Sequence, residues 1–136
     1  MPSFAAIVFD LDDTLYAERE YAYSGFTAVA EAFADRLGDP RDSAARMRRL
    51  FDSEHRPRVF NALLAELGLS EEFKLVAAMI EVYRAHRPTI RLHNDADAIL
   101  KKMRPEYRLG LLTDGRSSTQ GLKIDALGLR NRFDAI

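Results

Sequence analysis

The chain has 136 residues and a formal net charge of −1, with 47% hydrophobic and 30% charged residues. Disordered chains combine low hydrophobicity with high net charge, so this composition predicts a folded globular protein. The near-neutral charge gives no support for binding to nucleic acid or to an acidic membrane. The absence of cysteine excludes disulfides and thiolate metal sites. Residues 1–9 contain no basic leader and too short an apolar stretch for a signal peptide, and no apolar run reaches the length of a membrane span, so we expect a cytoplasmic protein.

Short apolar runs predict β-strands at three places. Residues 4–9, FAAIVF, are continuously apolar and include β-branched and aromatic side chains, which favours a strand buried on both faces. Residues 108–113, RLGLLT, follow the same pattern after a charged segment. A third run begins at Phe133.

Most of the remaining chain has apolar residues at helical spacing. Asp39 followed by Pro40 is a typical helix start, since aspartate caps the helix and proline is tolerated in the first turn. Gly38, Gly68 and Gly128 stand where helices are expected to end. The predicted helices cover 26–37, 40–52, Pro57 to Gly68, Ser70 through Tyr83, a segment starting at Asn94 or Asp95, and 117–127.

Strands that alternate with helices predict an α/β fold with a parallel sheet. Roughly 70 helical residues separate the first two strands, far more than a crossover connection needs. We therefore expect an all-helical insertion, residues 17–87, in a core formed by residues 1–16 and 88–136.

The stretch VFDLDDTL, residues 8–15, places three carboxylates directly after the first strand. In open parallel sheets, ligands bind at the carboxyl ends of the strands, where Asp10 and Thr113 both lie. Thr113 is followed by Asp114, Gly115 and a predicted helix start, and a helix N-terminus suits phosphate. A magnesium ion would neutralise the carboxylates and bind phosphate oxygens at the same time.

These two motifs, FDLDDTL and LLTDG, resemble those of the haloacid dehalogenase-like (HAD) superfamily of phosphohydrolases. Asp10, Asp12 and Thr14 match the first motif, D-x-D-x-[TV], and Thr113 matches the second. The helical insertion is similar to the family's cap, and residues 121–136, GLKIDALGLRNRFDAI, are similar to the segment that follows the second motif. The resemblance implies a Rossmann-like core with a helical cap.

Roles follow from this resemblance position by position. Asp10 would be the nucleophile, giving an aspartyl-phosphate intermediate, and Asp12 the general acid and base. Thr113, with the backbone N–H groups of Asp114 and Gly115 nearby, would bind the phosphoryl group. The resemblance implies Mg²⁺, held by the Asp10 carboxylate and the main-chain carbonyl of Asp12. An aspartate at position 12 favours phosphate transfer over dehalogenation. A helical cap that closes over the site excludes bulky substrates, so the implied substrate is a small phosphorylated metabolite.

The family's lysine and later acidic pair have no match in these residues. Lys123 lies in the helix after the second motif, and Lys101 and Lys102 precede the second strand. The first strand would also expose an apolar edge, which natural proteins avoid. We therefore expect a missing C-terminal segment or a partner chain to cover that edge. Alternatives to a phosphatase are a phosphomutase of the same superfamily and a catalytically incomplete, non-catalytic binding domain.

Several other residues have both a functional and a structural interpretation. Asp13 is expected to be a turn residue. The insertion's arginines either recognise an anionic substrate tail or form a solvated, ion-paired face, which we favour. These arginines are Arg41, Arg46, Arg48, Arg49, Arg56 and Arg58, interspersed with Asp42, Asp52 and Glu54. The three histidines lack metal-ligand spacing. Tyr16, Arg19 and Tyr23 could line a substrate entrance or pack in the core.

Overall fold

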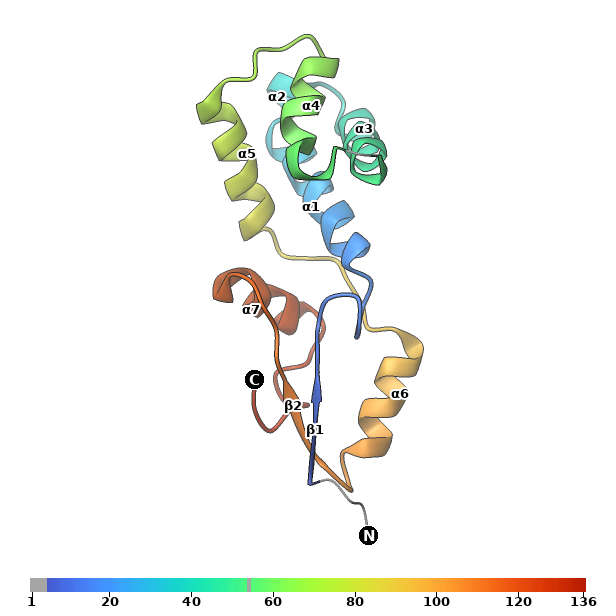
Figure 1. Ribbon diagram of the computed structural model, residues 1–136. Coiled ribbons are helices and arrows are strands. Elements are labelled where there is room, and N and C mark those ends of the chain that lie inside the picture. Colours follow the sequence, from blue (N-terminus) through green and yellow to red (C-terminus); the bar gives the residue numbers. More distant parts are fainter. Residues whose placement is uncertain (1–4, 54) are drawn as a thin grey trace. The chain divides into compact units, whose positions relative to one another are not determined.

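The computed structural model describes residues 5–53 and 55–136, and the chain divides into two compact units (Figure 1). The first unit joins the N-terminal stretch through Tyr21 to Arg87–Ile136, and the second is Ala22–His86. Helix α1, Glu18–Ala32, begins in the first unit and continues into the second. Phe4 of the predicted first strand and Glu54 of the insertion lie outside the described residues. The interpretation of residues 17–87 as a cap stays a prediction.

A parallel pair of strands forms the sheet of the first unit. Strand β1, Ala6–Phe9, pairs with β2, Arg108–Leu111, in a register that runs from Ala6 opposite Arg108 to Phe9 opposite Leu111. The predicted α/β arrangement is thus confirmed. On the other side of β2, Ala135 forms a bridge with Gly110, and its main-chain oxygen accepts a 2.9 Å hydrogen bond from the Leu111 N–H. The third apolar run therefore begins beside β2, opposite β1.

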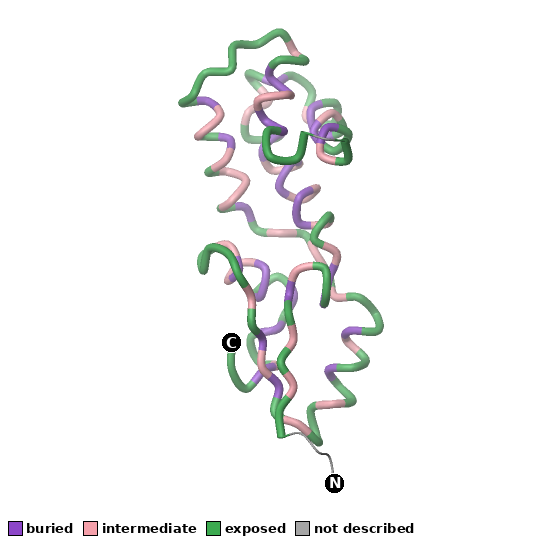
Figure 2. Tube along the Cα trace, viewed as in Figure 1, coloured by how far each residue is buried: buried purple, intermediate pink, exposed green. Residues whose placement is uncertain are grey.

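Only one face of this sheet is covered in the part of the chain that the structure describes. Leu109 and Leu111 are buried, whereas Val8 is 64% exposed and Leu112 is 71% exposed. Side chains alternate between the two faces of a strand, so these pairs mark a covered face and an open one. Figure 2 shows this alternation of exposed and intermediate residues along β1. The prediction that the first strand is buried on both faces is therefore wrong for this chain.

Two helices of the first unit flank β2 in sequence. Helix α6, Asn94–Met103, begins where the sequence placed its start, and α7, Ser117–Ala126, ends before Gly128, which has a φ of 66°. Their apolar sides contribute Leu100 and Ile124 to the buried residues of this unit, together with Leu129 and Phe133 from the segment after α7.

The second unit is a group of helices around an apolar core. It contains the rest of α1, α2 (Ala34–Leu37), α3 (Pro40–Asp52), the 3₁₀ helix η1 (Arg56–Arg58), α4 (Val59–Glu66) and α5 (Phe73–Ala85). Val29, Met47, Leu63 and Met79 are fully buried at its centre. None of the helices in the described residues is both long and apolar enough to cross a membrane.

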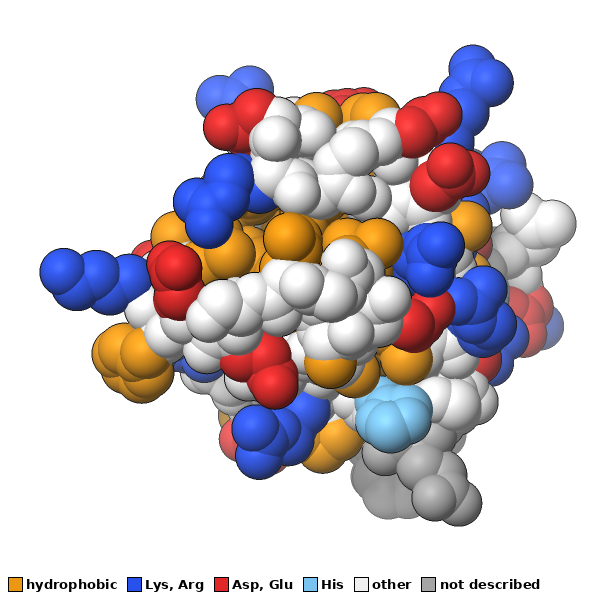
Figure 3. Space-filling view, turned by 90° about the horizontal axis from the view of Figure 1, so that it is seen from above, with side chains coloured by type: hydrophobic (Ala, Val, Ile, Leu, Met, Phe, Trp, Pro, Cys, Tyr) orange, Lys and Arg blue, Asp and Glu red, His pale blue; other side chains and the backbone are white. Residues whose placement is uncertain are grey.

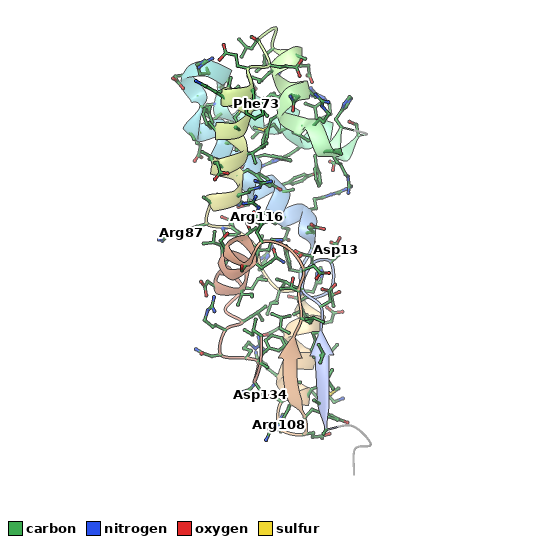
Figure 4. All side chains as sticks on the ribbon, turned by 60° about the vertical axis from the view of Figure 1, so that its left-hand side comes forward. Asp13, Phe73, Arg87, Arg108, Arg116 and Asp134 are labelled. Carbon is green, nitrogen blue, oxygen red and sulfur yellow. The ribbon has the colours of Figure 1, made fainter. Side chains whose placement is uncertain are left out.

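Helix boundaries in this unit follow the sequence signals in part. Asp39 caps α3 as predicted, because its Oδ1 accepts a 2.9 Å hydrogen bond from the Arg41 N–H. The predicted helix over 26–37 is instead interrupted at Phe33, which separates α1 from α2. Ser70 does not cap α5, which begins at Phe73, an exposed aromatic residue at its N-terminus (Figure 4).

Candidate functional site

The loop after β1 is anchored by its apolar residues. The main-chain oxygen of Leu11 accepts hydrogen bonds from the N–H groups of Thr14 and Leu15, at 3.2 and 3.0 Å. The side chains of Leu11, Leu15 and Tyr16 are buried. Because these anchors fix the turn, Asp12 and Asp13 between them, and Asp10 just before Leu11, are held in defined positions at the end of the strand.

Asp13 supports this turn and the start of α1. It has a φ of 57°, a conformation that aspartate tolerates better than most residues. Its Oδ1 accepts a 2.9 Å hydrogen bond from the N–H of Glu18, the first residue of α1. In Figure 4, Asp13 lies at one end of the first unit's sheet and Arg108 lies at the other end. The carboxylate therefore performs the structural role expected of a turn residue.

Asp12 lies at the centre of a network of hydrogen bonds. Its Oδ1 accepts from the Tyr16 hydroxyl at 2.5 Å and from Lys123 Nζ at 2.8 Å. Its Oδ2 accepts from Gln120 Nε2 at 2.9 Å. Lys123 is buried, and its ammonium also lies 4.4 Å from the ring centroid of Tyr21, a favourable cation–π geometry.

These contacts determine the proton affinities of Asp12 and Tyr16. Burial alone would raise the pKa of Asp12, but the hydrogen bonds from Lys123, Tyr16 and Gln120 and the charge of Lys123 outweigh it and lower the pKa. Burial, followed by the hydrogen bond to the Asp12 carboxylate, raises the pKa of Tyr16 far above its usual value. At neutral pH Asp12 is therefore a carboxylate and Tyr16 a neutral donor.

The loop after β2 is tied to the same network through α7. Gln120 Nε2 donates to the Thr113 Oγ1 at 2.7 Å as well as to Asp12. Gly115 has a φ of 120°, and a side-chain carbon on it would lie 3.4 Å from the Gln120 side chain. The side-chain amide of the buried Gln120 thus donates one hydrogen bond to Asp12 in the loop after β1 and one to Thr113 in the loop after β2. Thr113 Oγ1 accepts from Gln120 and itself donates a long, 3.5 Å hydrogen bond to the main-chain oxygen of Asp114, a contact weak enough for a ligand oxygen to replace.

A pocket of about 380 Å³ opens at the carboxyl ends of the two strands. It is lined by Asp10, Thr113 and Asp114 together with Val8, Phe9 and Leu112. Asp10 is exposed, and its carboxylate has no hydrogen bond or ion pair within residues 5–53 and 55–136. The structure thus brings the residues of the two motifs together, with Asp12 joined to Thr113 through Gln120 and with Gly115 outside the pocket lining.

Few side chains in this site are placed to coordinate a metal ion. Among the described residues, no three acidic or histidine side chains gather around one point. The Asp12 carboxylate already accepts from Tyr16, Gln120 and Lys123. The Asp10 carboxylate and the main-chain oxygen of Asp12 fit the magnesium preference for one or two protein oxygens with the remaining positions filled by water and phosphate.

The sequence did not predict the roles of Tyr16, Gln120 and Lys123. From its position in the sequence, Lys123 does not match the family's lysine, and no other role is predicted for it. A usable signal was present, because Gln120 and Lys123 lie three positions apart in the helix after Thr113 and so share one helix face. The contacts of that face with Asp12, more than 100 residues earlier, appear only in the folded chain.

Comparison with known proteins decides the family. The family model for haloacid dehalogenase-like hydrolases matches residues 4–136. The chain belongs to the haloacid dehalogenase-like hydrolase family. A curated relative, glyceraldehyde 3-phosphate phosphatase from Methanopyrus kandleri, is 28% identical over 140 residues, which cover 96% of this chain. The match covers 60% of that relative's length.

Solved structures agree with the fold. The HAD-hydrolase YfnB from Bacillus subtilis, bound to magnesium, matches with a TM-score of 0.63 and 19% identity, over 98% of this chain and 62% of its own. A Thermotoga maritima protein assigned as a β-phosphoglucomutase matches with a TM-score of 0.60 and 16% identity, over 97% of this chain and 60% of its own. The chain thus has the α/β HAD fold with helices inserted, and it spans about three fifths of these proteins.

Proposed function

We propose that the protein is a magnesium-dependent phosphohydrolase that acts on a small phosphomonoester through an aspartyl-phosphate intermediate. The observation that carries this proposal is the pocket in which Asp10, Thr113 and Asp114 meet, with Asp12 held beside it. The curated relative, which is a phosphatase by name, supports the same class of reaction.

In the first step, a carboxylate oxygen of Asp10 attacks phosphorus and the bond from phosphorus to the leaving oxygen breaks. Asp12, in its protonated form, gives its proton to that oxygen. In the second step, Asp12 as a carboxylate takes a proton from water. The water oxygen attacks phosphorus, and the bond to Asp10 breaks, so that inorganic phosphate leaves and both aspartates are restored.

The surrounding residues prepare these groups. The lowered pKa of Asp12 keeps it ionised in the free protein, so Asp12 must take up a proton as the substrate binds before it can act as the acid of the first step. Thr113 is oriented by Gln120 to donate its hydroxyl hydrogen to a phosphoryl oxygen. A bound magnesium ion would neutralise charge on the transferring group, and the Asp10 carboxylate and the Asp12 main-chain oxygen would hold it.

The proposal is tested by the release of inorganic phosphate from p-nitrophenyl phosphate with and without magnesium. We expect magnesium-dependent turnover that Asp10→Asn abolishes, while Asp35→Asn, an exposed change on α2, leaves it unchanged. Absence of phosphate release in the presence of magnesium would contradict a phosphatase. A transfer of phosphate to a sugar phosphate in place of water would instead indicate a phosphomutase.

Two other expectations belong to this proposal. The protein would work in the cytoplasm, where phosphorylated metabolites are found. A further segment of the same protein or a partner chain would cover the open side of the sheet, because Val8 and Leu112 expose apolar surface there and the curated relative is longer than this chain.

A further inference from the structure

The second unit contains a pocket of its own, of about 240 Å³. Every residue that lines it belongs to Ala22–His86, so the pocket is independent of the loops that carry Asp10 and Thr113. The lining residues come from α1, α3, η1, α4 and α5: Phe26, Phe51, Arg56, Pro57, Arg58, Val59, Phe60, Asn61, Val76, Ile80, Tyr83 and Arg84.

Aromatic rings form much of the wall of this pocket. The ring of Phe26 lies 5.6 Å from that of Phe51, 6.2 Å from that of Phe60 and 5.7 Å from that of Tyr83, measured between centroids. The Tyr83 ring is stacked on Phe26, whereas the other two meet it edge-on. Phe26 and Phe60 are buried, so the wall is fixed by core packing and is apolar and aromatic.

Three arginines add positive charge to the same pocket. Arg56 is held in place, because its Nε donates to the main-chain oxygen of Phe51 at 3.2 Å and its guanidinium lies 4.6 Å from the Phe51 ring centroid. Arg58 and Arg84 line the pocket without a carboxylate partner in the described part of the chain. No acidic residue is among the described residues of the lining.

Three other arginines of this unit have partners of their own. Arg46 and Arg49 both form ion pairs with Glu66, at 2.9 and 2.7 Å, and Arg48 donates to Thr27 Oγ1. Figure 3 shows basic and acidic side chains interspersed on one face of the molecule. The favoured interpretation of an ion-paired face therefore suits Arg46 and Arg49, whereas Arg56, Arg58 and Arg84 gather where no such partner is described.

The size of the pocket limits the ligand. A dry apolar cavity of about 150 Å³ accommodates benzene, and drug-sized ligands occupy roughly 300 Å³ or more. The pocket lies between these values, which suits one ring or a short branched chain bearing an acidic group. Guanidinium groups bind carboxylates and phosphates through paired hydrogen bonds. We propose that this pocket binds a small organic anion in which a carboxylate or phosphoryl group is joined to a flat apolar body.

The test is a titration of the whole chain with benzoate, phenylphosphonate and neutral benzamide, followed through backbone amide chemical shifts. We expect both anions to shift the amides of η1, α4 and the second half of α5, and the anion that binds more tightly to identify the acidic group. Benzamide is expected to bind about tenfold more weakly or worse, because it lacks the charge-assisted hydrogen bonds.

Variants locate the binding determinants. Arg58→Gln and Arg84→Gln are each expected to weaken binding about tenfold, whereas Arg41→Gln, an exposed change at the start of α3, leaves it unchanged. Amide spectra of all three variants confirm that each remains folded.

Three results would overturn the proposal: equal binding of benzamide and benzoate, binding by Arg58→Gln and Arg84→Gln as tight as that of the unaltered chain, or shifts confined to the loops around Asp10 and Thr113. Phosphatase activity does not enter the titration, so failure of this proposal and failure of the proposed function are separate results.

Discussion

The contact between Lys123 and Asp12 makes a prediction that the structure allows us to work out in detail. Lys123→Met removes the ammonium but keeps a flexible apolar chain to pack against Tyr21. The Lys123 side chain is 6% exposed and that of Asp12 is 25% exposed. Loss of the lysine would therefore leave a carboxylate largely out of solvent with one donor fewer.

The magnitude follows from this burial. Removal of one partner from a fully buried ion pair costs about 3–5 kcal/mol. Asp12 retains the Tyr16 and Gln120 hydrogen bonds and is partly solvated, so the cost here should be smaller. We expect the first unit to lose about 2 kcal/mol of stability, which corresponds to a roughly 30-fold increase in the population of its opened state.

Amide hydrogen exchange measures this quantity for the first unit separately, through the protected amides of β1, β2 and α7. A double-mutant cycle with Asp12→Asn isolates the coupling between the two side chains. The matched control is the pair Arg130–Asp125, which also involves α7 and has a similar 2.7 Å separation but side chains 58% and 59% exposed. A coupling between Lys123 and Asp12 no larger than that of the control pair would refute the reasoning.

Three further predictions rest on other contacts. Gln120→Leu should lower kcat for phosphate release about tenfold or more with a smaller change in KM, because Thr113 loses the donor that orients it; an unchanged kcat would contradict this. Burial lowers the pKa of His86, although its hydrogen bond with the Tyr83 main chain acts in the opposite direction. In the unfolded chain this histidine is protonated below about pH 6.5, whereas in the folded chain it stays neutral to lower pH. The melting temperature of the second unit should therefore fall as pH drops below about 6.5, and His86→Asn should flatten this dependence. Val8→Lys should leave the melting temperature of the chain unchanged, since the Val8 side chain is 64% exposed; a lower melting temperature would show that this side chain is packed.

The sequence predicted the elements whose ends have a local chemical cause. Asp39 and Pro40 define the start of α3, and Gly128 follows the end of α7 in a positive-φ conformation. The prediction of a helix start was wrong where the candidate capping residue makes no capping hydrogen bond in the described part of the fold. Ser70 is a good capping residue, yet α5 begins three residues later, after Glu72 in an extended conformation. The exposed face of β1 was also unpredictable, because an apolar run does not reveal what packs against it.

For the candidate site, the sequence predicted which strand ends would carry the chemistry but not what holds them together. Asp10 and Thr113 line the same pocket because the carboxyl ends of paired parallel strands lie side by side. The donors to Asp12 could not be read in the same way. Tyr16 looked like a core or entrance residue, and Lys123 and Gln120 come from a helix far along the chain. Such contacts depend on how α7 packs, which residue spacing alone does not specify.

The three carboxylates after β1, those of Asp10, Asp12 and Asp13, have three different environments. We therefore expect their substitution to affect stability and activity differently. Asp13 accepts a hydrogen bond from the first residue of α1, and Asp12 is compensated by Lys123 and two neutral donors. Asp10 alone among them lies open in the pocket without a partner in the described chain. An uncompensated carboxylate that adjoins others contributes repulsion rather than stability. Asp10→Asn should therefore leave the free energy of unfolding equal or higher while removing the proposed nucleophile. The carboxylate of Asp10, which no positive group of the described chain neutralises, is therefore the one that a bound cation or phosphoryl group would contact.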